Sequence, residues 1–144
     1  MYGLPDHLKK LSPAEEQVML ALWAARPPAT RAEIARQLRP PAGGSPWADP
    51  TLLNFLYRLE AKGWVKSSKQ GNRNVYAPLV THRAYGVYVM RERLDTLFGG
   101  DLAAAVMALV SESRTGQTQL EKARAVLDEK LAAAMEYDWY DPYG

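Results

Sequence analysis

The sequence contains no cysteine and only two histidines among its 144 residues. The absence of cysteine excludes disulfides, Cys-based zinc sites and thiol redox sensing, and two histidines are too few for a His-rich metal site. No run reaches the ~18 consecutive apolar residues of a membrane helix, and the first residues lack the pattern of a signal peptide. We therefore expect a cytoplasmic protein without membrane insertion.

The usual arrangements of catalytic residues are also missing. The sequence shows no Ser/His/Asp or Cys/His set, no Gly-rich phosphate loop and no cluster of metal ligands. Glu15 and Glu16 fall in the first turn of a predicted helix, where negative charge is favourable, and Asp101 suits a helix cap. The sequence thus predicts no enzyme activity, no catalytic or metal-binding residues and no cofactor.

Charge is divided unevenly along the chain. Residues 1–80 carry 11 Lys and Arg against 6 Asp and Glu, a net of +5, whereas residues 81–144 carry 7 against 10, a net of −3. A basic first part and an acidic second part favour a polyanionic partner, such as double-stranded DNA, for the first part only.

Two capping boxes predict the first two helices: Ser12 with Glu15, and Thr30 with Glu33. The first helix should run to about Ala25, and the second should end before the Pro- and Gly-rich loop at residues 40–47. Trp23, Trp47 and Trp64 are better explained as packing anchors than as platforms for base stacking.

The segment from Asp49 to Leu79 combines the strongest signals in the chain. Asp49 suits a helix cap and Gly63 a helix stop, and apolar residues between them repeat at helical spacing. Two short strands, WVKSSK and NVYAPL, follow and flank a polar hairpin turn. Three helices followed by a hairpin predict a mainly α, α+β fold: a winged helix-turn-helix with a small β-hairpin wing.

In a winged helix, the third helix enters the DNA major groove and the wing lies along the backbone. The residues expected to bind DNA lie on the polar face of the third helix, on the hairpin and on the second helix: Thr51, Asn54, Tyr57, Arg58, Lys62, Lys69, Arg73 and Arg31. Asn54 can bond adenine, and Leu53 or Tyr57 can meet a thymine methyl group. Arg58 could instead be an ordinary surface residue, and the hairpin cations could belong to a solvated turn.

After Thr81 the chain changes to three predicted helices, capped by Thr81, by Asp101 and by a Thr118–Glu121 capping box. Their apolar stripes are narrow and should pair with a second chain, although they could pack back on the winged helix. The expected dimerisation residues are Leu94, Leu102, Val106, Leu109, Leu127 and Leu131. The predicted domains are 1–80 for DNA binding and 81–135 for dimerisation, followed by an acidic aromatic tail at 136–144.

Several motifs, taken in order, resemble the penicillinase-repressor family of transcriptional regulators, which includes BlaI, MecI and CopY. They are LSPAEEQVMLALW, RAEIARQL, Trp47, RLEAKGWV, Gly71, YAPLV and LFGGDLAAAVMALV, within residues 11–131. The resemblance implies a homodimeric repressor that binds an inverted-repeat operator through its winged helix. It also implies a C-terminal dimerisation region of three helices.

In the β-lactam-responsive members, a membrane sensor-protease triggers cleavage between Asn and Phe in the helix after GGD. The matching bond here is Ala108–Leu109, so the residues that flank it differ. The copper-responsive members carry a Cys-rich motif that this chain lacks. Two other functions stay open: a protein-binding adaptor with weak DNA affinity, and a regulator with a small-molecule pocket lined by Tyr85, Tyr88 and Met90.

Overall fold

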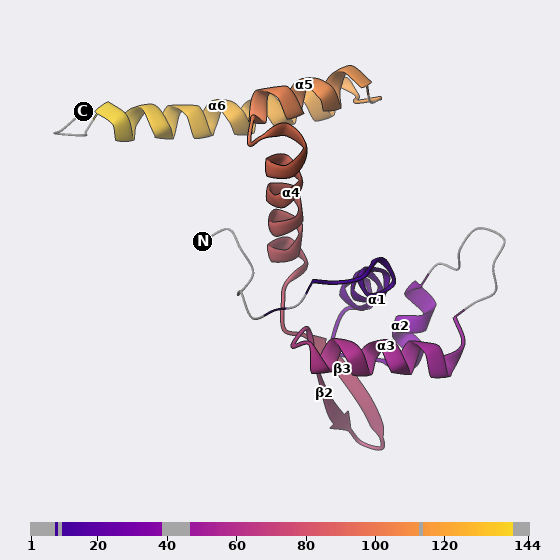
Figure 1. The fold of residues 1–144 in the computed structure, drawn as a ribbon. Helices are drawn as coiled ribbons and strands as arrows, with labels where there is room; N and C mark the ends of the chain where they lie inside the picture. The colour runs from indigo at the N-terminus through magenta and orange to yellow at the C-terminus, as the bar shows by residue number, and fades with distance from the viewer. Residues whose placement is uncertain (1–7, 9, 39–46, 113, 140–144) are drawn as a thin grey trace. The chain divides into compact units, whose positions relative to one another are not determined.

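The structure, a computed structural model, describes residues 8, 10–38, 47–112 and 114–139 (Figure 1). It is mostly helical with one small antiparallel sheet, which confirms the predicted winged-helix fold class. The chain forms two compact units, Met1–Arg93 and Leu94–Gly144. The predicted loop at 40–47 lies outside the described residues except for Trp47, and so does the end of the tail.

The first unit begins with helices α1 (Pro13–Ala24), α2 (Arg31–Gln37) and α3 (Asp49–Ala61). Both predicted capping boxes are present, because Ser12 and Thr30 each exchange two hydrogen bonds with the Glu three positions later. The predicted cap of α3 is wrong: Ala48 occupies that position, and its carbonyl accepts a hydrogen bond from the Leu52 amide at 3.1 Å. Asp49 is therefore already inside the helix.

Gly63 ends α3 as predicted. Its φ of +85° lies in the left-handed region that favours glycine. The Gly63 amide donates to the Glu60 carbonyl at 3.1 Å, and the Trp64 amide donates to the Leu59 carbonyl at 2.9 Å. These bonds satisfy the last carbonyls of α3 and direct the chain straight into the first strand of the wing.

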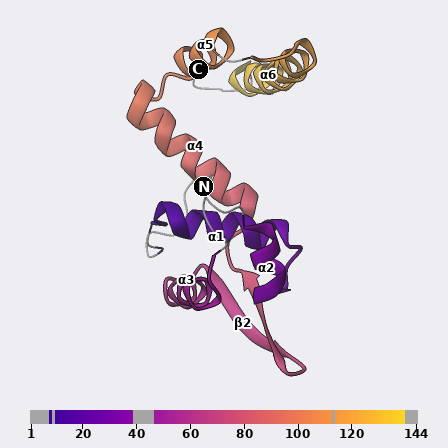
Figure 2. The same cartoon turned by 90° about the vertical axis from the view of Figure 1, so that its right-hand side faces the viewer.

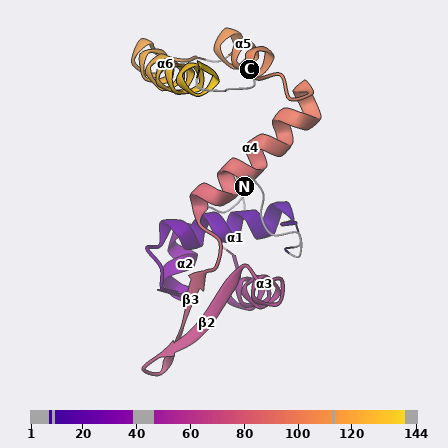
Figure 3. The same cartoon turned by 90° about the vertical axis from the view of Figure 1, so that its left-hand side faces the viewer.

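The wing consists of β2 (Val65–Gln70) and β3 (Arg73–Pro78), which pair antiparallel with Gln70 opposite Arg73. A third strand, β1 (Ala29–Thr30), pairs with β3 and gives the sheet order β1-β3-β2. The sequence did not predict β1, because two residues are too few to show the alternation of a strand. Figures 2 and 3 show the hairpin projecting away from the three helices.

The core of the first unit lies among α1, α2, α3 and the start of β2. Its largest fully buried side chains are Val18, Met19, Leu22, Ile34, Leu52, Leu56, Leu59, Trp64 and Val65. Three of them repeat along one side of α3, so the opposite side of that helix faces water. This division leaves α3 with one side that holds it to the protein and one side open to a partner.

Helix α4 (His82–Phe98) begins in the first unit and ends in the second. Thr81 caps it as predicted, with its hydroxyl accepting from the Ala84 amide at 3.1 Å. The division between units falls at Arg93 rather than at residue 80, because the first turns of α4 contact α1. Gly99 and Gly100, both with positive φ, end the helix as the sequence predicted.

Helices α5 (Leu102–Glu112) and α6 (Gln117–Trp139) form the rest of the second unit and run in opposite directions (Figure 1). Asp101 caps α5 as predicted, accepting from the Ala104 amide at 3.0 Å. The predicted Thr118–Glu121 capping box is wrong because α6 starts at Gln117, so Thr118 lies inside the helix, and Glu121 accepts from the Gln117 side chain at 2.9 Å instead. Helix α6 also continues beyond the predicted end at 135.

No single helix within the described residues is long and apolar enough to cross a membrane, although the bent pair His82–Phe98 and Leu102–Ser111 meets both criteria when the two are joined.

Candidate nucleic-acid interface

The outward side of α3 carries the residues expected to read DNA. Thr51, Asn54, Tyr57 and Arg58 are all exposed, and Tyr57 is 76% exposed. Leu53 beside them is 43% exposed, so it is not part of the core. The structure thus brings together one helix face with an amide, a hydroxyl, a guanidinium and two apolar groups. Such a mixture can donate to base edges and also contact thymine methyl groups.

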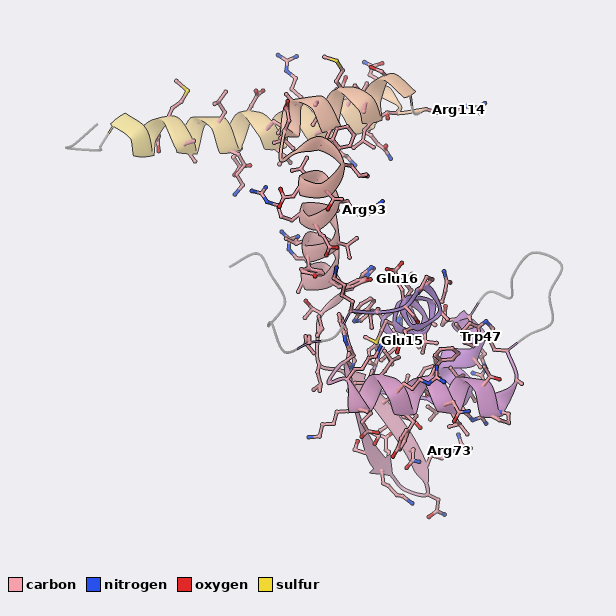
Figure 4. All side chains as sticks on the ribbon, viewed as in Figure 1. Glu15, Glu16, Trp47, Arg73, Arg93 and Arg114 are labelled. Atoms are coloured by element: carbon pink, nitrogen blue, oxygen red, sulfur yellow. The ribbon has the colours of Figure 1, made fainter. Side chains whose placement is uncertain are left out.

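Arg58 is held against an aromatic side chain. Its guanidinium carbon lies 5.3 Å from the ring centroid of Phe55, which is three positions earlier on α3. The Phe55 ring in turn packs at 5.3 Å, centroid to centroid, against Trp47. Trp47 precedes α3 and is labelled in Figure 4. Phe55 belongs to the apolar residues that repeat at helical spacing between Asp49 and Gly63, but that spacing gives no sign of its contact with Arg58.

Lys62, expected at the DNA interface, has a different position. Its Nζ lies 2.6 Å from Oε1 of Glu15 and also donates to the Lys10 carbonyl at 3.2 Å. The Glu15 side chain is only 3% exposed. Lys62 therefore neutralises a buried carboxylate and joins the end of α3 to α1, and this engagement argues against the predicted contact with DNA.

Burial alone would raise the pKa of Glu15, since it penalises the charged form. Hydrogen bonds from Lys62 and from the Ser12 amide and hydroxyl favour the carboxylate and together outweigh burial, so the pKa lies below its ordinary value. The carboxylate is thus charged under physiological conditions. It serves both the capping box of α1 and the ion pair with α3.

The two cations predicted on the wing lie on opposite faces of the hairpin. Lys69 stands opposite Asn74 and Arg73 opposite Gln70, and neighbouring pairs in an antiparallel ladder point to alternate faces. Both side chains are exposed, and Figure 4 shows Arg73 on the hairpin. The wing therefore presents a positive charge to each side rather than one basic face.

The base of the wing is attached to α3. Glu60 accepts hydrogen bonds from the Ser67 hydroxyl at 2.7 Å and from its amide at 3.3 Å. Tyr76 of β3 stands opposite Ser67, and Arg31 at the start of α2 is half-buried and close enough for its charge to act on Tyr76. Burial and then Glu60 raise the pKa of Tyr76, and the charge of Arg31 opposes them. These contacts fix the hairpin relative to the third helix.

Trp23, Trp47 and Trp64 pack within the first unit, as the sequence predicted. Trp64 is 1% exposed. Trp23 donates from Nε1 to the Val80 carbonyl at 3.0 Å, and its ring stacks on His82 at 4.8 Å. The start of α4 is thereby anchored to α1.

Tyr85 strengthens the same junction. Its hydroxyl donates to Glu16 on α1, and its ring lies edge-on to Trp64 at 5.5 Å. Burial, followed by the hydrogen bond to Glu16, raises the pKa of Tyr85 well above its ordinary value. Of the three residues considered for a pocket between paired helices, Tyr85 therefore packs in the first unit, Tyr88 is half-buried and Met90 is 71% exposed.

The predicted dimerisation residues lie in the second unit. Leu102, Leu109, Leu127 and Leu131 are 48–62% exposed, and Leu94 and Val106 are half-buried. In the described part of α5 and α6 no side chain is buried. The Ala108–Leu109 bond lies inside α5. No group of three or more His, Cys, Asp or Glu residues in the described ranges could hold a metal ion.

Comparison with known proteins assigns the chain to a protein family. The Penicillinase repressor family profile matches residues 11–129. A curated relative from Latilactobacillus sakei, "Uncharacterized 16.5 kDa protein in ptsI 3'region", is 23% identical over 133 residues, or 92% of this chain and 88% of that protein. The match of the profile covers the motifs noted in the sequence and confirms the resemblance that they indicated.

Two solved structures are similar to the chain. One is the monomeric form of Bacillus licheniformis BlaI in complex with the blaP half-operator, which is 28% identical with a TM-score of 0.43 and covers 54% of this chain and 90% of that chain. The other is MepR, a transcription regulator of the Staphylococcus aureus multidrug efflux pump MepA. It is 18% identical with a TM-score of 0.44 and covers 87% of this chain and 81% of that chain.

Proposed function

The chain belongs to the penicillinase repressor family of DNA-binding transcriptional regulators, and from this premise we propose that it is a homodimeric repressor of an inverted-repeat operator. The observation that carries the proposal is the exposed face of α3 beside a wing with cations on both sides. Thr51, Asn54, Tyr57 and Arg58 contact bases or phosphates in the major groove. Arg73 and Lys69 contact the backbone on either side of the wing, and Arg31 adds positive charge at α2.

The exposed leucines of the second unit support pairing of two chains. Fully burying a leucine side chain contributes about 1.5–3 kcal/mol, and four leucines of α5 and α6 are about half exposed or more in one chain. A second copy that covers these stripes removes them from water. Two winged helices in one dimer then occupy the two half-sites of the operator, which supplies the affinity that one module lacks.

Release from DNA follows from loss of the dimer. A sensor-protease that cuts at Ala108–Leu109 would divide α5 and remove the pairing surface. Because this bond lies in a helix, α5 must unwind locally before a protease can accept it in extended form. A repressor that binds bacterial chromosomal DNA acts in the cytoplasm, which is the location that we propose.

The test is selection of preferred duplexes from a random library, followed by titration of the selected and a scrambled duplex at physiological salt. We expect an inverted repeat and a marked preference for it. Equal affinity for both duplexes would overturn the repressor proposal. In that case the exposed Leu53 and Tyr57 would favour the alternative of a protein-binding adaptor, which pull-down with a defined partner would then have to establish.

A further inference from the structure

We infer that Phe55, supported by Trp47, positions the Arg58 guanidinium for its contact with DNA. The inference rests on the proposed use of α3 as the DNA-binding helix, and it deepens that proposal by assigning a role to two residues that do not themselves face the DNA. It starts from one chain of contacts: Trp47 packs on Phe55, and Phe55 lies under Arg58.

The contact follows from helical geometry. Residues three positions apart lie on the same side of a helix, so Arg58 can fold back over the Phe55 ring. The distance of 5.3 Å from guanidinium carbon to ring centroid is within the range of a cation–π interaction. Within the described residues no carboxylate forms an ion pair with Arg58. The ring therefore orients the guanidinium without neutralising its positive charge, which remains able to interact with the negatively charged DNA.

The Phe55 ring is itself restrained. It is half-buried, packs against the apolar core and contacts the Trp47 ring at an interplanar angle of 59°. Trp47 lies two residues before α3 and packs against the core of the first unit, so its contact with Phe55 ties the start of α3 to the middle of the same helix. A leucine at position 55 could fill similar apolar space, but it would offer no π face to Arg58.

Orientation matters because an arginine side chain loses much rotamer freedom when it binds, and a side chain that is already ordered loses less. A cation–π contact at an exposed site corresponds to about a two- to five-fold effect on an equilibrium constant. We therefore expect the aromatic support to raise DNA affinity by a factor of this size, and only through Arg58.

A double-mutant cycle tests this dependence. Phe55→Leu, Arg58→Ala and the double variant are titrated with the selected duplex, and Phe55→Tyr serves as the matched control that keeps the ring. We expect Phe55→Leu to weaken binding about two- to five-fold when Arg58 is present and to have no further effect when Arg58 is Ala. Phe55→Tyr should bind like the unchanged protein, and Trp47→Leu should weaken binding in the same Arg58-dependent way.

The outcomes separate the inference from the proposed function. If Phe55→Leu weakens binding equally in both Arg58 backgrounds, Phe55 only stabilises the fold and the inference is overturned. The same conclusion follows if Phe55→Leu has no effect, or if Arg58→Ala binds as tightly as the unchanged protein, while the repressor proposal stands in all three cases. Loss of preference for the selected duplex in the unchanged protein would instead remove the proposed function together with the inference.

Discussion

Lys62 Nζ lies 2.6 Å from Glu15 Oε1, although the two residues are 47 positions apart in the sequence. The pair joins the last turn of α3 to the first turn of α1, and Lys62 also bonds the carbonyl of Lys10. The position of α3 thus depends on a carboxylate that also caps α1.

Replacing Lys62 with Met should destabilise the protein, because it leaves Glu15 buried without its partner. Breaking a buried pair typically costs about 3–5 kcal/mol, and we expect about 2 kcal/mol here because the Lys62 side chain is 27% exposed and water can partly replace it. Urea unfolding would measure the change. Lys66→Met on β2 is the control, since an exposed lysine there should change the free energy of unfolding by less than about 0.5 kcal/mol.

The same pair predicts a dependence of stability on pH. The pKa of Glu15 is lower in the folded protein than in the unfolded chain, so its contribution is present above the unfolded value near 4.5 and is lost as the pH falls through the folded value. Unfolding free energies from about pH 7 to about pH 3 should fall less steeply for Glu15→Gln than for the unchanged protein. Parallel curves for the two proteins would contradict this assignment.

The sequence predicted those parts of the fold whose signals are local. Both N-terminal capping boxes, the Gly63 stop and the caps at Thr81 and Asp101 depend on residues within a few positions of one another, and all are present. At Asp49 and Thr118 the helices begin one and two residues earlier than predicted, because the residues that precede them are Ala48 and Gly116, which have no polar side chain to mark the start. The exposed face of α3 followed from periodicity in the same way.

Contacts between distant segments could not be predicted. The sequence gives no sign that Lys62 meets Glu15 or that Tyr85 meets Glu16, because neither pair has a fixed spacing. For this reason Lys62, which is half-buried, was predicted at the DNA interface, and Tyr85 was considered for a ligand pocket and not for the junction with α1. The strand β1 was missed because its pairing with β3 is a tertiary contact without a local pattern.

Tyr85→Phe should loosen the junction between α1 and α4. The change keeps the ring against Trp64 but removes the hydrogen bond to the Glu16 carboxylate. The free energy of unfolding should fall by about 1–2 kcal/mol. Hydrogen exchange should show faster exchange of amides in residues 82–93. Tyr88→Phe is the matched control, because Tyr88 bonds Glu92 on the same helix and does not join α4 to α1. Equal effects of the two changes would argue against a special role for Tyr85.

Val106→Asp and Leu127→Asp should each prevent dimer formation, because they place a charge in the apolar stripes of α5 and α6 that we propose to pair. Analytical ultracentrifugation should show monomers, and binding of the inverted repeat should weaken sharply while binding of a single half-site changes little. By helical spacing, Lys122 lies on a different side of α6 from Leu127, so Lys122→Asp is the control. If the Val106 and Leu127 variants remain dimeric, the second unit does not form the dimer interface.

Arg73→Ala should weaken binding of the selected and the scrambled duplex by the same factor, because a wing residue that contacts phosphate carries no sequence information. Loss of one phosphate contact should also lower the slope of log affinity against log salt concentration by about one. Lys69→Ala tests the opposite face of the hairpin, so equal effects of the two changes would mean that DNA meets both faces. An effect of Arg73→Ala confined to the selected duplex would instead assign Arg73 to base recognition.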